Sequence, residues 1–319
     1  MKTGMKPGKK ALFLPLLLVQ VLLMLPAFGC TTDTTNETTI AAPTTTPADM
    51  GQQIQQILVD AVEKQETLTS YKYSLVMDMD VEATGGTEQG KVTMNYQYSG
   101  AIDLPSEQLQ MSLAVNMKTE IPGEAENYNM ETVMDVYMLD DWVYARMEIT
   151  GEPEQWVRAP VTDEIETSFK LNPVDQQMGL LDSPSDIEYV GDASINGIDC
   201  YVVAIKPSIE ALEEWFTEQN TDSEIVDMSN MMDFADTIRS FSYTCYISKE
   251  SVQLEKVVFN ILFAFTPEQT GDDTDAYDEL TMYINMDIEM FDQNIPFAID
   301  LPDEAANAQD TFSDPGFLE

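Results

Sequence analysis

Few side chains in this sequence combine a reactive type with a suggestive spacing. Histidine is absent, which removes the commonest general base and the usual protein ligand of zinc and copper. The 57 acidic residues are spread so widely that no single pair of carboxylates stands out as a catalytic acid and base. The Gly-x-Ser-x-Gly motif of serine hydrolases does not occur. We therefore expect neither an enzyme nor a cofactor, and the three cysteines remain as the reactive groups.

The first cysteine, Cys30, ends an apolar segment that a basic start precedes, a pattern typical of a secretory signal. Ala27-Phe28-Gly29-Cys30 resembles the lipobox of bacterial and archaeal lipoproteins, in which cleavage leaves the cysteine at the new N-terminus for acylation. The resemblance implies a signal peptide over residues 1–29 and a lipid on Cys30 that anchors an extracytoplasmic protein to the cell membrane. The alternatives are a plain signal and an uncleaved membrane helix, since the apolar run approaches the roughly 20 residues that span a bilayer.

Residues 30–50 are rich in threonine, proline and acid. Such a segment has too little apolar surface to offset the entropy lost on folding, so we expect a disordered stalk between the anchor and the folded part. The whole chain carries a formal net charge of −42, which repels nucleic acid. We therefore exclude nucleic acid as a partner.

The other two cysteines, Cys200 and Cys245, form an even pair in a compartment that we expect to be oxidising. Both lie in segments with the alternation of strands, and the two strands could be neighbours. We expect a disulfide between them, which would contribute at most about 4 kcal/mol by restricting the unfolded chain. The alternative is two separate buried thiols.

Most of the chain after residue 70 alternates apolar and polar side chains, as in YKYSLVMDMDV, KVTMNYQYSG and ELTMYINMDIEM. Turns with glycine or proline, such as ATGGTEQG and IPGEAEN, separate these runs. The pattern predicts roughly nine to eleven strands in an antiparallel meander with one apolar face. Asn196-Gly197 predicts a tight hairpin, and helical spacing predicts helices over residues 50–69, 163–181 and, in two pieces, 207–238.

The order of these elements resembles the lipoprotein-carrier superfamily, which comprises LolA/LolB-like proteins and LppX/LprG-like lipoproteins. The likeness rests on the helix that leads into LTSYKYSLVMDMDV, on the aromatic strands DDWVYARMEI and EQWVRAP, and on INGIDCYVVAIKP followed by helices and long strands. It implies an α+β fold over residues 51–301, a strongly curved antiparallel sheet or half-open β-barrel whose concave face is covered by helices. It also implies binding of lipid or lipoprotein acyl chains without catalysis. We expect residues 302–319 to form a polar tail.

Many of the 20 methionines fall on the apolar strand faces. Methionine is flexible and suits varied apolar partners, so these faces either line a cavity for acyl chains or fill an ordinary core, and periodicity does not separate the two. The residues expected to line a cavity are Tyr73, Leu75, Met77, Met79, Met94, Tyr96, Met111, Leu113, Met282, Ile284 and Met286.

Two functions follow as hypotheses. The first is a membrane-anchored carrier or sensor of a hydrophobic ligand, and the alternative is a cell-surface protein-interaction module with a filled core and an unknown partner. A binding protein for polar solutes is disfavoured because alternating βαβ patterns are missing. The acidic turn with Asp272, Asp273, Asp275, Asp278 and Glu279 could hold calcium, but it lacks the glycine and spacing of an EF-hand loop, so we expect no metal site.

Overall fold

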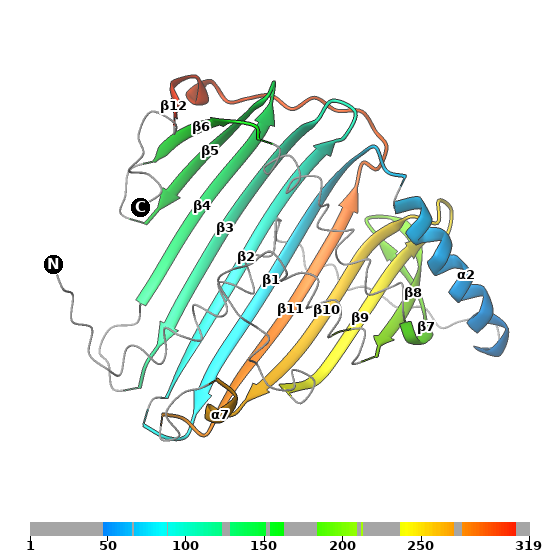
Figure 1. Ribbon diagram of the computed structural model, residues 1–319. Coiled ribbons are helices and arrows are strands. Elements are labelled where there is room, and N and C mark those ends of the chain that lie inside the picture. Colours follow the sequence, from blue (N-terminus) through cyan, green and yellow to red (C-terminus); the bar gives the residue numbers. More distant parts are fainter. Residues whose placement is uncertain are drawn as a thin grey trace.

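One large sheet dominates the computed structural model of the protein (Figure 1). The structure describes residues 47–65, 67–87, 89–122, 128–150, 154–162, 184–208, 212, 237–270 and 276–310. The strands are β1 (Ser70–Thr84), β2 (Gly90–Asp103), β3 (Gln108–Glu120), β4 (Tyr128–Leu139), β5 (Trp142–Ile149), β6 (Gln155–Pro160), β7 (Pro184–Ile195), β8 (Ile198–Pro207), β9 (Ile238–Ser248), β10 (Leu254–Phe265), β11 (Glu279–Phe291) and β12 (Gln309–Asp310). The helices are α2 (Pro47–Gln65), α7 (Pro267–Thr270) and the 3-10 helix η3 (Asp303–Asn307).

The twelve strands lie in the order β12-β6-β5-β4-β3-β2-β1-β11-β10-β9-β8-β7. All neighbours are antiparallel except β12 and β6, which are parallel. The first long strand therefore pairs with the last long one at the centre of the sheet, and this joins the two halves of the chain. The sheet is strongly curved and unclosed, which confirms the predicted curved antiparallel sheet and is consistent with a half-open barrel (Figure 1).

Tight turns join several neighbouring strands. In the β7–β8 hairpin, Asn196 and Gly197 have φ values of 51° and 87°, as a two-residue turn with left-handed backbone at both positions requires, and the predicted hairpin is confirmed. Asp140 and Asp141 do the same between β4 and β5, with φ values of 51° and 65°. Such turns match the right-handed twist of the strands that they connect, which keeps the strands in register.

The leading helix is present as α2 and packs near β7, β9 and β10. Its apolar residues Ile54, Leu58 and Ala61 belong to the main hydrophobic core. The helices predicted over 163–181 and 207–238 lie almost entirely outside the described residues, so a helical cover over the concave face is not shown. Within the described part, Thr237 is helical and Ile238 begins strand β9, so the structure places the end of this helix one residue before the predicted one.

Residues 292–310, called here the C-terminal strap, run from the end of β11 to the far edge of the sheet (Figure 1). From the sequence we expect only a polar tail over residues 302–319, whereas the structure has η3 and the short strand β12, which pairs with β6. Ile299 of the strap packs with Tyr137 and Leu139 in a second, smaller core.

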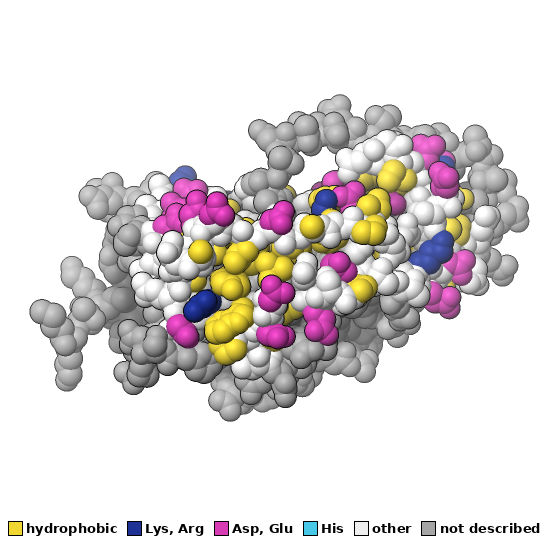
Figure 2. All heavy atoms as spheres, turned by 90° about the horizontal axis from the view of Figure 1, so that it is seen from above, with side chains coloured by type: hydrophobic (Ala, Val, Ile, Leu, Met, Phe, Trp, Pro, Cys, Tyr) yellow, Lys and Arg dark blue, Asp and Glu magenta, His cyan; other side chains and the backbone are white. Residues whose placement is uncertain are grey.

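Seen from above, the surface carries a band of hydrophobic side chains (Figure 2). Acidic side chains lie beside this band, and few basic side chains are visible in this view.

Candidate ligand-binding face

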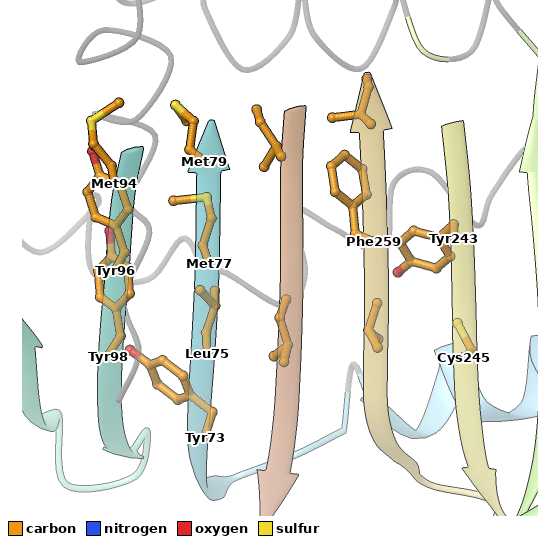
Figure 3. Packing of buried hydrophobic residues seen from close by; sticks show 14 of the residues in the cluster. Tyr73, Leu75, Met77, Met79, Met94, Tyr96, Tyr98, Tyr243, Cys245 and Phe259 are labelled. Carbon is orange, nitrogen blue, oxygen red and sulfur yellow. The ribbon is translucent and has the colours of Figure 1, made fainter. Parts of the chain in front are cut away.

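The residues predicted to line a cavity all project from one side of the sheet, called here the apolar face. Nine of the eleven are buried, and the other two, Leu113 and Met286, are partly buried against the same core. Figure 3 shows side chains of neighbouring strands lying on this common side. The structure thus brings the predicted residues together; that they contact a ligand stays a prediction.

Directly opposed residues form rows across the apolar face. Met77 of β1 lies opposite Tyr96 of β2 on one side and Met286 of β11 on the other, and Met286 in turn lies opposite Phe259 of β10. Side chains that face one another in this way are close enough to pack, and such pairs are the unit that stabilises a sheet. The rows therefore turn separate strand patterns into one continuous apolar surface.

Tyrosine hydroxyls supply most of the polarity at the centre of the face. Burial raises the pKa of Tyr73 and of Tyr96, and burial followed by the nearby tyrosines raises the pKa of Tyr98. These phenols therefore stay neutral across the physiological range, and a neutral phenol can donate a hydrogen bond. The hydroxyl of Tyr96 donates to the thioether sulfur of Met94 at 3.4 Å.

Charged side chains are confined to the other side of these strands. On β1, β2, β3, β4, β10 and β11 the register places no Asp, Glu, Lys or Arg of the described residues in the rows of the apolar face. The opposite side carries polar contacts such as Asn95 to Asp78 at 2.8 Å and the ion pair of Lys91 with Asp80 at 3.0 Å. In a chain with 57 acidic residues, this separation leaves a surface suited to uncharged groups.

Exposure of the apolar face changes along one row. Leu75 and Tyr98 are 3% and 2% exposed, whereas Met147 on β5 is 45% exposed. Leu113 and Met134 lie between them in the register and are partly buried. The face therefore continues from the core to solvent over β3, β4 and β5. Met134 and Met147 are absent from the residues predicted to line the site, although the alternation of their strands was visible in the sequence.

The two cysteines of the fold are free and buried, and this corrects the predicted disulfide. Cys200 lies opposite Ser248, whereas Cys245 lies opposite Val203, three positions further along the paired strands β8 and β9. An odd offset places the two side chains on opposite faces of the sheet, where a disulfide cannot close. Burial raises the pKa of the Cys200 thiol to about 12, and burial likewise raises the pKa of Cys245.

Other predicted sites lie partly or wholly outside the described residues. Cys30, the signal segment and most of the stalk are not described, and neither are Asp272, Asp273 and Asp275 of the acidic turn. In the described part of the chain, no three His, Cys, Asp or Glu side chains group as a metal site would need. No described helix combines the length and the apolar character that crossing a membrane requires.

Comparison with known proteins finds similar structures at low identity. No protein-family model and no curated protein matches the chain. The chain is similar to LprF from Mycobacterium bovis, with 14% identity, a TM-score of 0.39 and coverage of 81% of this chain and 99% of that chain. It is similar to the lipoprotein LppX from Mycobacterium tuberculosis, with 12% identity, a TM-score of 0.35 and coverage of 78% and 99%. A DUF1329 family protein from Desulfovibrio piger has 12% identity, a TM-score of 0.21 and coverage of 81% and 96%. LppX thus occurs both among the similar structures and in the resemblance drawn from the sequence.

Proposed function

We propose that this protein is an extracytoplasmic lipoprotein, anchored to the membrane through Cys30, that binds a lipid or acyl chain on the apolar face without catalysing a reaction. One observation carries the proposal. The row Leu75, Tyr98, Leu113, Met134 and Met147 runs from the core to solvent and includes no charged side chain. An apolar ligand that docks at its exposed end meets a continuous apolar path inward.

The minimum size of the ligand follows from comparing the free-energy cost of association with the gain from burying methylene groups. Association costs about 4–15 kcal/mol in lost freedom of motion, and each buried methylene contributes about 0.8 kcal/mol. About 5 to 19 buried methylenes are thus needed before binding is favourable, which favours long acyl chains over small apolar solutes. Because Leu75 and Tyr98 are almost fully covered, the inner part of the row accepts a chain only if the residues that cover it move aside.

Native mass spectrometry tests the proposal on a form of the protein that begins at Thr31 and keeps every described element. The protein is purified without detergent, its mass is recorded, and bound material is extracted into organic solvent. We expect a lipid at near one-to-one stoichiometry, or its uptake when lipid is added. A ligand-free mass with no uptake would contradict the proposal and favour a protein-interaction module with a filled core.

Two variants locate the binding surface. Met147→Glu places a charge at the exposed end of the row, and Val59→Glu places the same charge on α2, where Val59 is 49% exposed. Both sites are exposed, so both changes are expected to leave folding intact. We expect Met147→Glu to lower lipid uptake about tenfold and Val59→Glu to leave it unchanged. Equal uptake by the two variants would show that lipid binds elsewhere.

The anchor is tested separately on the full chain. If Cys30 is acylated, the purified protein lacks residues 1–29 and carries the added mass of a diacylglyceryl group. Two acyl chains hold a protein stably on a membrane, whereas one does not. We expect Cys30→Ser to prevent the acylation and to leave residues 1–29 attached. An unmodified Cys30 in the wild-type protein would contradict this part of the proposal.

A further inference from the structure

Four methionines lie directly opposite one another across four neighbouring strands. Met79 of β1 is paired with Met94 of β2, Met94 with Met117 of β3, and Met117 with Met130 of β4. Elsewhere in the described register, methionines oppose each other only in twos, as Met77 with Met286 and Met134 with Met147. This longer set, called here the methionine row, has no counterpart on the rest of the face.

The sulfur atoms of such a row are within reach of a shared ion. Directly opposed residues have Cβ atoms about 4.5–5.5 Å apart, and the unbranched methionine side chain can turn its sulfur toward a neighbour. Figure 3 shows Met79 and Met94 side by side on their adjacent strands. With strands about 4.8 Å apart, the whole row spans about 14 Å, so one ion would contact two or three consecutive sulfurs.

The exposure of the four methionines determines which of them an ion can reach. Met79 and Met94 are 0% and 2% exposed, whereas Met117 and Met130 are only partly buried. Thioethers are neutral, so a bound cation keeps its charge, and burying an uncompensated charge is costly. The half-buried pair therefore provides the access route, and Met94 provides the third sulfur at the inner side.

The thioether groups of the methionine row determine which kind of cation it would bind. Thioethers are soft ligands that favour Cu(I) over harder cations such as magnesium or calcium. No histidine competes, and the net charge of −42 raises the local concentration of any cation. We propose that Met94, Met117 and Met130 form a binding site for a soft monovalent cation, namely Cu(I), for which Ag(I) is a probe that undergoes no redox change. This site lies on the same apolar face as the proposed lipid-binding row but uses none of its five residues, and its test does not require that lipid binds.

Titration of the full chain with Ag(I) in detergent solution tests the site, with Cys30→Ser in every sample to remove the thiol that precedes the fold. The triple variant Met94→Leu, Met117→Leu and Met130→Leu keeps apolar volume nearly constant. The matched control replaces three other methionines by leucine, namely Met111, Met138 and Met282. None of these lies directly opposite another methionine. Both triple variants lose three thioethers and keep Cys200 and Cys245.

We expect one Ag(I) ion to bind, with at least tenfold weaker affinity in the row variant and with less than a twofold change in the control. Equal losses of Ag(I) affinity in both variants would overturn the proposal. So would Ag(I) binding by the row variant that equals binding by the unsubstituted protein. Should the row variant fail to fold, Met117→Leu alone serves, since its side chain is only partly buried. X-ray absorption at the silver edge is expected to show a first shell of sulfur, and a shell of oxygen or nitrogen would overturn the site.

Discussion

Gly100 lies directly opposite Tyr73, and the tyrosine ring occupies the space where a side chain at Gly100 would stand. A Cβ atom added at Gly100 would come within 2.2 Å of the ring carbon Cε1 and 2.4 Å of the hydroxyl oxygen. Real Cβ atoms essentially never approach other atoms so closely. The missing side chain of one strand therefore makes room for the ring of the next.

Gly100→Ala is expected to destabilise the protein by about 1–3 kcal/mol, because the ring must leave a well-packed position. Alanine also restricts the unfolded chain more than glycine does, which offsets about 0.5–1 kcal/mol of the loss. Urea unfolding measures the net change. In a Tyr73→Leu background, which lacks the ring atoms that meet the new Cβ, the same substitution should be neutral or stabilising. Equal costs in both backgrounds would show that the ring is not the cause.

The two free cysteines allow a prediction about how the protein reacts with a thiol reagent. Both thiols are buried and their pKa values are raised, so they are neutral at physiological pH and react slowly. We expect iodoacetamide to leave Cys200 and Cys245 unmodified in the native protein and to label both after denaturation without a reductant. Recovery of label only after reduction would contradict the register of β8 and β9.

The cysteines also show where sequence reasoning reaches its limit. Alternation within each segment predicted that Cys200 and Cys245 lie in strands, and both do. Whether they share a face depends on the register between β8 and β9, which are separated by a long stretch of chain. Register is set by packing across strands, and no local pattern encodes it.

Local sequence patterns predicted those features of the fold that depend only on residues close together in the chain. The two-residue turn at Asn196 and Gly197 follows from the left-handed backbone that these residue types adopt readily, and the apolar residues of β1 follow from period-two alternation. The pairing of β1 with β11 joins segments about 200 residues apart and could not be predicted in this way. Similarly, the gradual exposure of the apolar face toward Met147 depends on what covers each strand.

Glu255 gives a pH dependence with a definite sign. It lies at a β-bulge between Leu254 and Lys256, it is 7% exposed, and burial raises the pKa of its carboxyl. A raised folded-state pKa means that the protonated group stabilises the fold. This contribution is fully present below the unfolded pKa of about 4.3 and is lost as the pH rises through the folded value.

Glu255→Gln keeps the shape and removes the charge. Relative to wild type, the free energy of unfolding of this variant is expected to rise with pH from about 4.3 toward neutrality, since only the wild type then ionises a buried group. Urea unfolding at acidic and neutral pH measures the difference. Glu250→Gln, in the exposed turn nearby, serves as the control and should show no such divergence. Parallel pH profiles for all three proteins would contradict the assignment.

Among the apolar side chains of the C-terminal strap that pack on the second core, Ile299 is the most buried, and we expect the strap to depend on it most. Ile299 is 7% exposed and packs with Tyr137 and Leu139, while Lys72 forms an ion pair of 2.6 Å with Asp292 at the start of the strap. Both charges of that pair are more than a third exposed, so it contributes little. Ile299→Ala should cost about 2–4 kcal/mol through lost burial and the cavity left behind.

Hydrogen exchange distinguishes detachment of the strap from general destabilisation. For Ile299→Ala we expect faster exchange over residues 292–310 than over β1 and β11, because the strap can open while the central strands stay paired. The control is Ile295→Ala in the same segment, where the side chain is 54% exposed and the change should cost less than about 0.5 kcal/mol. If both variants exchange alike, the other contacts of the strap, such as Phe297 and Leu301 on the second core, hold it, and Ile299 is not decisive.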